Sequence, residues 1–291
     1  MSKGPFSVLF AGTPSFAVPS LLALANDAGF RVELVITQPD KPVGRKKAVT
    51  PSPVKVTAQK LGIPVWQPGD INKEWTVGST QWTTPDFLVV VAYGQILKRE
   101  ILVAPKIAAI NVHASLLPRW RGASPIHHAI LGGDATTGIT VQRMAEKLDT
   151  GPVLRQMATS IEARETFPEL HDRLAVMGAE LLVETLKSPL RETPQDERAA
   201  TICRKLSRKT GDVDPLTMTA EEIDRKVRAL NPWPGVRCAV DGTIVKLLRT
   251  SLTERPESVP LGCRESVLHL LEVQPEGRTA MTATEWMRGK R

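Results

Sequence analysis

The sequence has few of the residues that mark secreted, membrane or metal-binding proteins. It contains only three cysteines, Cys203, Cys238 and Cys263, whose odd number and wide spacing fit neither a disulfide framework nor a zinc site. No apolar run approaches the roughly 18 residues that span a bilayer. The first residues also lack the charged start and apolar core of a secretory signal. We therefore expect reduced thiols, no bound metal, no membrane segment and a cytoplasmic location.

Acidic residues are outnumbered by basic ones. The sequence holds 38 Lys and Arg against 31 Asp and Glu, which gives a net charge of +7. This balance favours a polyanionic partner such as nucleic acid, although charge alone does not establish one. A length of 291 residues allows two domains of about 100–200 residues each.

The first 189 residues predict an α/β domain. An apolar run at 6–10 precedes Gly12, Thr13 and Pro14, and a helical pattern follows through Leu24, as at the start of a Rossmann-like unit. The unbroken apolar run FLVVVA at 87–92 suits a parallel strand that is covered on both faces. We therefore predict a Rossmann-like domain with a mostly parallel sheet over residues 1–189.

Residues 190–205 are predicted to be a linker, because the stretch is polar, contains a proline and shows no periodicity. In residues 206–291, Thr219 and Glu222 form a possible capping box at the start of a helix over 219–230. Short strands with turns are expected at 237–250, at 267–274 and near Thr279. This pattern predicts a small OB-like β-barrel, a module that commonly binds oligonucleotides.

The stretch INVHASLLP at 110–118 carries the clearest chemistry. If residues 109–113 form a strand, its period of two places Asn111 and His113 on the same face. Pro118 cannot continue a central strand, so the chain must leave the sheet just after the histidine. In open α/β sheets, ligands bind outside that edge.

Asn111 and His113, together with Asp149 of the later LDTG sequence, suit acyl or formyl transfer. An asparagine amide that donates to a carbonyl oxygen as it becomes negative typically lowers the barrier by about 3–4 kcal/mol. Histidine can carry a proton near neutral pH. The aspartate can orient the imidazole, stabilise its cation or accept the proton that an attacking amine must lose. The chemistry requires no Ser or Cys nucleophile if the substrate's own amine attacks.

The run NVHASLLPRWRGASPI at 111–126, with LDTG at 148–151, closely resembles the folate-dependent formyltransferases. Further matching runs extend the resemblance over nearly the whole chain: GTPSFAVPSL at 12–21, QPDKPVGRKK at 38–47, VVVAYGQIL at 89–97 and NPWPG at 231–235. The resemblance implies formyl transfer from 10-formyltetrahydrofolate to the amine of methionine carried by initiator tRNA. It also implies that Asn111, His113 and Asp149 are catalytic. The residues implied to contact the folate are Ser115, Leu116, Leu117 and Pro118.

Two basic clusters are expected to contact the tRNA. The loop at 38–53 is longer than a typical connection, and clustered cations favour phosphate contact through counterion release. In the resembled family this loop meets the acceptor end of tRNA, and Arg45 is the first choice for a contact. A second cluster follows the linker. The predicted contacts are Lys41, Arg45, Lys46, Lys47, Arg204, Lys205, Arg208 and Lys209.

Other functions remain open from the residues alone. The same three side chains serve formyl transfer to small amines, such as glycinamide ribonucleotide or an amino sugar, and they also serve formyltetrahydrofolate hydrolases. The second domain and the basic loop argue against the small-amine transferases, and a hydrolase would not need the predicted barrel that follows NPWPG. A non-catalytic RNA-binding protein on an enzyme fold is a different class, and the intact Asn111, His113 and Asp149 argue against it. We take a monomer as the expected state.

Overall fold

The computed structural model describes residues 4–43, 48–75, 83–240 and 242–289, and this described part of the chain forms two compact units. Unit 1 comprises residues 1–122, 137–159 and 171–202, and unit 2 comprises residues 123–136, 160–170 and 203–291. Each unit is therefore assembled from separate stretches of sequence. None of the helices in the described ranges is both long and apolar enough to cross a membrane.

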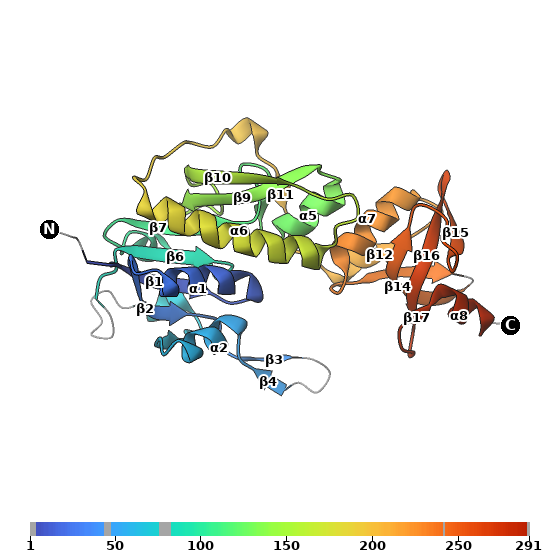
Figure 1. The fold of residues 1–291 in the computed structure, drawn as a ribbon, viewed down its shortest axis with the longest axis horizontal. Coiled ribbons are helices and arrows are strands. Elements are labelled where there is room, and N and C mark those ends of the chain that lie inside the picture. Colours follow the sequence, from blue (N-terminus) through green and yellow to red (C-terminus); the bar gives the residue numbers. More distant parts are fainter. Residues whose placement is uncertain (1–3, 44–47, 76–82, 241, 290–291) are drawn as a thin grey trace. The chain divides into compact units, whose positions relative to one another are not determined.

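Within the described residues, the sheet of unit 1 has seven strands in the order β10-β9-β7-β6-β1-β2-β5 (Figure 1). The strands from β7 to β5 run parallel, and β9 pairs antiparallel with β7. The prediction of a mostly parallel sheet is therefore confirmed. The bounds are β1 (Phe6–Gly12), β2 (Phe30–Ile36), β5 (Val65–Trp66), β6 (Phe87–Val91), β7 (Ala108–His113), β9 (Thr136–Arg143) and β10 (Val153–Ser160).

The helices that accompany this sheet begin where local signals place them. Ser52 precedes α2, and its side chain accepts the backbone N–H of Lys55, as expected of an N-cap. At the start of α6, Glu169 accepts hydrogen bonds from the backbone N–H and the hydroxyl of Thr166. The bounds are α1 (Val18–Asn26), α2 (Pro53–Lys60), α3 (Ile71–Glu74), α4 (Arg99–Leu102) and α6 (Phe167–Lys187).

Helix α6 packs closely on the sheet because Gly178 faces it. A Cβ atom at this position would lie 3.1 Å from Cγ1 of Val112 on β7 and 3.6 Å from Cδ1 of Ile139 on β9. The glycine therefore lets the helix approach the strands that flank the predicted site.

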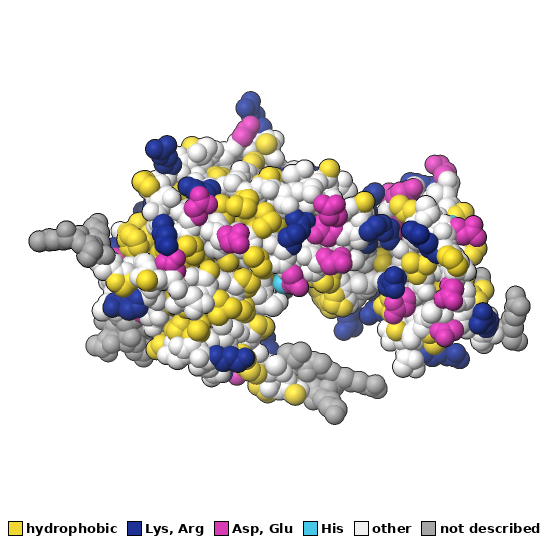
Figure 2. Space-filling view, in the orientation of Figure 1, with side chains coloured by type: hydrophobic (Ala, Val, Ile, Leu, Met, Phe, Trp, Pro, Cys, Tyr) yellow, Lys and Arg dark blue, Asp and Glu magenta, His cyan; other side chains and the backbone are white. Residues whose placement is uncertain are grey.

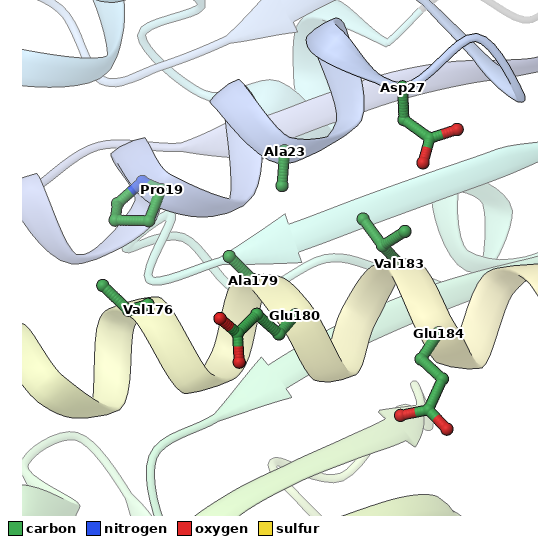
Figure 3. A pocket seen from close by; sticks show the side chains of 8 residues that line it. All are labelled: Pro19, Ala23, Asp27, Val176, Ala179, Glu180, Val183 and Glu184. Carbon is green, nitrogen blue, oxygen red and sulfur yellow. The ribbon is translucent and has the colours of Figure 1, made fainter.

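A groove lies between α1 and α6 (Figure 3). Its lining is mostly aliphatic, with carboxylates among the apolar side chains: Pro19, Ala23, Asp27, Val176, Ala179, Glu180, Val183 and Glu184. Asp27 forms an ion pair of 2.5 Å with Lys187 near one end of these helices. None of the predicted site residues lines this groove, so the candidate site lies elsewhere in the unit.

Within the described residues, the sheet of unit 2 has six strands. The main path is β12-β13-β14-β16-β15, and β17 pairs with β16. Pairing along this path is antiparallel except between β12 and β13, and residues of β13 alternate between buried and exposed. The bounds are β12 (Asp212–Val213), β13 (Val236–Val240), β14 (Thr243–Ser251), β15 (Val259–Cys263), β16 (Ser266–Pro275), β17 (Met281–Thr282), α5 (Pro125–Gly132), α7 (Ala220–Leu230) and α8 (Ala283–Arg288). The unit is β-rich, but the described pairings form an open path, so the predicted OB-like barrel is not confirmed.

The short strand expected near Thr279 is present as β17, but the helix that follows it was not expected. A two-residue strand, β17, is followed at once by helix α8. Thr282 and Glu285 form a capping box, in which Thr282 Oγ1 accepts the Glu285 N–H at 3.2 Å and the Glu285 carboxylate accepts the Thr282 N–H at 3.0 Å. Trp286 is buried and anchors the helix.

A buried carboxylate joins separate stretches of unit 2. Asp224 on α7 is 1% exposed, and its oxygens accept hydrogen bonds of 2.8 Å from Arg164 Nη1 and 2.9 Å from Arg228 Nε. The hydroxyl of Thr250 on β14 donates to the same carboxylate at 2.8 Å. The charge is therefore neutralised inside the unit, and its partners come from three stretches of sequence.

The cysteines are free thiols, as the sequence predicted. Burial raises the pKa of Cys238 to about 11. At pH 8 this thiol is then almost entirely protonated, and the thiolate is the reactive form. We expect iodoacetamide to label Cys238 at least about a hundredfold more slowly in the native protein than in the urea-unfolded protein at pH 8. Mass spectrometry of the peptide that contains Cys238 measures both rates, and equal rates would contradict the assigned burial.

Candidate active site

Strand β7 presents two polar side chains at its carboxyl end. Asn111 and His113 point to the same side of the strand, while Val112 between them packs against Gly178 of α6. His113 is 7% exposed, so its imidazole is largely shielded from water. The sequence predicted this arrangement from the strand period.

Asp149 comes to the same place from the turn between β9 and β10. Its backbone has a φ of +55°, a conformation uncommon for residues other than glycine. Its Oδ1 atom lies 3.4 Å from Asn111 Nδ2 and 3.7 Å from His113 Nδ1. The structure thus brings together the three side chains that were predicted to act together.

Gly151 allows this turn to fold back tightly. A Cβ atom at Gly151 would lie 1.8 Å from the carbonyl oxygen of Arg143, which is far inside any permitted contact. Only glycine therefore fits at this point of the turn.

Two further donors hold the Asp149 carboxylate. Gln142 is the register partner of Asn111 on the neighbouring strand β9, and its Nε2 donates to Asp149 Oδ1 at 3.2 Å. The backbone N–H of Gly122 donates to Oδ2 at 2.8 Å. The side chain of Asp149 is 7% exposed. Both oxygens of this buried carboxylate therefore have partners, and its orientation is set from two sides.

The protonation pattern of His113 follows from its other neighbour. Nε2 lies 2.9 Å from the backbone carbonyl oxygen of Trp120. Because a carbonyl oxygen only accepts, Nε2 must carry a proton. Nδ1 is then the ring position that faces Asp149.

The predicted folate residues form the turn that follows β7. The Ser115 hydroxyl is fully buried and donates to the Arg119 carbonyl oxygen at 2.5 Å, and Leu117 is also buried. Leu116 and Pro118 are half-buried. Ser115 and Leu117 therefore shape the turn, while Leu116 and Pro118 are the side chains that remain accessible to a ligand.

The predicted tRNA contacts lie in both units. Lys41 begins β3 (Lys41–Val43), which pairs with β4 (Ala48–Thr50) in unit 1. Arg45, Lys46 and Lys47 lie outside the described residues. On the face drawn in Figure 2, basic side chains alternate with acidic ones.

In unit 2 the predicted contacts occupy an exposed stretch before β12. The buried Leu206 anchors this stretch to the unit. The exposed cations are Arg204, Lys205, Arg208 and Lys209.

Unit 2 also contains a hollow of about 1190 Å³ that the sequence did not reveal. Its lining includes five cations and three carboxylates, contributed by the start of α6, by α7, β14 and β16, and by the loops near them. These are Arg164, Arg228, Lys246, Arg249, Arg255, Glu169, Glu257 and Glu272. Their irregular spacing in the chain leaves no motif from which the hollow could have been predicted.

Comparison with known protein families shows to which family the chain belongs. The formyl transferase model matches residues 6–186, and the model for the formyl transferase C-terminal domain matches residues 205–291. The chain belongs to the formyl transferase family. In this formyl transferase the clustered Asn111, His113 and Asp149 all lie inside the first match.

Relatives of this formyl transferase match it along nearly its whole length. It is 43% identical to a methionyl-tRNA formyltransferase of Halorhodospira halophila, over 98% of this chain and 96% of that protein. It is 44% identical to one of Paracoccus denitrificans, over 97% of each. An N-formyltransferase from Helicobacter canadensis, solved with folinic acid and dTDP-3-aminofucose, superposes with a TM-score of 0.66 at 18% identity, over 92% of this chain and 98% of that one. That last likeness shows the fold.

No metal is assigned to this formyl transferase. In the part of the chain that the structure describes, no group of three or more His, Cys, Asp or Glu is placed to hold a metal ion.

Proposed function

We propose that the protein is a methionyl-tRNA formyltransferase. It transfers the formyl group of 10-formyltetrahydrofolate to the α-amino group of methionine on initiator methionyl-tRNA, which produces formylmethionyl-tRNA for translation initiation. The observation that carries this proposal is the identity of 43% and 44%, over 98% and 97% of the chain, to proteins of that name. The clustered polar groups at the end of β7 supply the chemistry.

In this reaction the methionyl amine attacks the formyl carbon, and the new C–N bond forms as the carbonyl oxygen becomes negative. Asn111 donates an N–H to that oxygen, and the imidazolium of His113 adds positive charge beside it. Asp149 keeps the His113 cation in place and accepts the proton that the amine loses. The bond between the carbon and the folate nitrogen then breaks, and the proton passes to the departing nitrogen.

The turn at 115–118 fits a folate because it combines accessible apolar side chains with a rigid backbone. Leu116 and Pro118 offer apolar contact directly after His113. The backbone of Leu117 is held on both sides, since Thr140 Oγ1 accepts its N–H at 3.0 Å and Gln156 Nε2 donates to its carbonyl at 2.9 Å. We therefore assign the folate contact to residues 115–118.

The tRNA partner accounts for the basic residues of both units. We assign phosphate contacts to Lys41, Arg45, Lys46 and Lys47 in the catalytic domain (1–189), and to Arg204, Lys205, Arg208 and Lys209, which lie in the linker (190–205) and the following domain (206–291). An OB-like architecture for residues 206–291 belongs to the same proposal. So do a monomeric state and a cytoplasmic location, where charged initiator tRNA is used.

The test is transfer of labelled formyl from 10-formyltetrahydrofolate to several acceptors in parallel. These are charged initiator tRNA, uncharged tRNA, free methionine and glycinamide ribonucleotide. We expect transfer to the charged initiator tRNA alone, with binding that weakens as salt rises, because the protein displaces counterions from phosphates. Transfer to a small amine, or release of formate without any acceptor, would replace the proposal with a small-amine transferase or a hydrolase.

A further inference from the structure

The polar stretch after α6 folds onto the turn that carries Asp149. The backbone groups of Thr193 and Val153 exchange two hydrogen bonds of 2.8 Å, which begins the contact. Gln195 then donates from Nε2 to the carbonyl oxygen of Asp149 at 2.9 Å and to that of Gly151 at 2.7 Å. A single side-chain amide therefore holds the turn on both sides of Thr150.

The orientation of this amide is set by a buried arginine. Arg121 is 4% exposed, and its Nε and Nη2 donate to Gln195 Oε1 at 3.0 and 2.8 Å. An arginine only donates, so the oxygen of Gln195 must face it and the NH2 group must face the turn. Glu197 completes the arrangement by accepting bonds of 2.9 and 2.8 Å from Nη1 and Nη2 of the same guanidinium. The hydrogen bond from Arg121 also holds the pKa of Glu197 below its usual range, so Glu197 stays charged near neutral pH.

The same stretch holds the partner of His113. Thr201 Oγ1 accepts the Trp120 N–H at 2.8 Å, and the Thr201 carbonyl oxygen accepts the Arg121 N–H at 2.9 Å. Trp120 is the residue whose carbonyl oxygen fixes Nε2 of His113. Residues 193–201 therefore hold both the turn of Asp149 and the loop that orients the imidazole.

We propose that Gln195 is a positioning residue for formyl transfer, which sets the carboxylate of Asp149 against His113 and Asn111 and is itself locked by Arg121 and Glu197. The inference rests on the proposed function. Its physical basis is that a non-glycine residue with a φ of +55° keeps that conformation only where its surroundings determine it. Gln195 supplies two of the hydrogen bonds that do so.

The test compares kcat of the full-length enzyme with saturating 10-formyltetrahydrofolate and charged initiator tRNA. Gln195→Met, which keeps the size but removes both polar ends, is expected to lower kcat by about 10- to 100-fold, because small misplacements of reacting groups are costly. KM for both substrates should change by less than about threefold. Gln195→Glu keeps an acceptor for Arg121 but loses the donors to the turn, so we expect a loss of similar size.

The decisive measurement repeats Gln195→Met in an Asp149→Asn background. If Gln195 acts through Asp149, the second substitution should lower kcat by less than about twofold there. If the two substitutions together lower kcat by the product of their separate effects, Gln195 has a general structural role and the inference is overturned. Thr193→Val on the same stretch is the matched control, since it keeps the backbone bridge, and its kcat should stay within about twofold of wild type.

The two proposals fail in different ways. An inactive wild-type enzyme with charged initiator tRNA would overturn the proposed function and the inference with it. An active wild type together with Gln195→Met and Gln195→Glu variants of near-normal kcat would overturn the inference alone.

Discussion

His113→Ala is expected to lower kcat for formyl transfer to initiator methionyl-tRNA by at least about a hundredfold, and the fold should be retained. In the proposed reaction the imidazolium stabilises the carbonyl oxygen as that oxygen becomes negative, and the loss of one such stabilising group typically lowers kcat by about a hundred- to a thousandfold. Asn111→Ala and Asp149→Ala should each cause a loss of at least about a hundredfold as well. Single-turnover rates with saturating folate and tRNA would measure the chemical step, and circular dichroism would verify folding.

The effects of these three substitutions on kcat should also be strongly non-additive when the substitutions are combined. Asp149 Oδ1 lies within 3.7 Å of both His113 Nδ1 and Asn111 Nδ2, so each loss disables the same arrangement. The control is His128→Gln on α5; the ring of His128 contacts the carbonyl oxygen of Ser124, the residue just before that helix. This variant should keep a rate within about twofold of wild type. A near-normal rate in any of the three alanine variants would remove that residue from the mechanism.

Asp224→Ala is expected to destabilise unit 2 by about 3–5 kcal/mol, which is the usual cost of removing one member of a buried ion pair. The carboxylate is 1% exposed and faces Arg164, Arg228 and the Thr250 hydroxyl. Its loss leaves the guanidinium of Arg228, only 12% exposed, without its counter-charge. Urea unfolding followed by tryptophan fluorescence would measure this loss. The unfolding transition of unit 2, which contains Trp286, should occur at a much lower urea concentration than in the wild type.

The matched control is Glu221→Ala, which removes an exposed carboxylate from the same helix. We expect a change within about 1 kcal/mol, because Glu221 is exposed and a carboxylate in the first turn of a helix contributes only about 0.3–1 kcal/mol. If the two variants unfold at the same urea concentration, the buried network contributes little to stability.

Features that depend on neighbouring residues could be predicted from the sequence. The period of β7 placed Asn111 and His113 on one face, and the Thr219–Glu222 pair located the start of α7. The same capping signature is present at Thr282 and Glu285, where no helix was expected, so helix α8 was predictable from the pattern that located α7.

Features that depend on which distant segments meet could not be predicted. Gln142 reaches Asp149 because β9 pairs with β7 in one particular register, and no local pattern reveals that register. Gln195 lies in a polar stretch without periodicity, which reads as a linker because composition does not show the buried guanidinium that it meets. Asp149 itself was singled out only through its pairing with Asn111 and His113, since an aspartate in such a turn is ordinary by itself.

The distance along the chain between Asp149 and the stretch 193–201 that holds its turn also determines the order in which a newly made protein can complete its active site. A nascent chain that ends at Lys187 already contains Asn111, His113 and Asp149. It still lacks the hydrogen bonds that residues 193–201 make to the Asp149 turn and to the Trp120 loop. The chain must therefore emerge from the ribosome as far as Thr201 before the site can take the geometry described here. Every predicted catalytic side chain has emerged some fifty residues earlier.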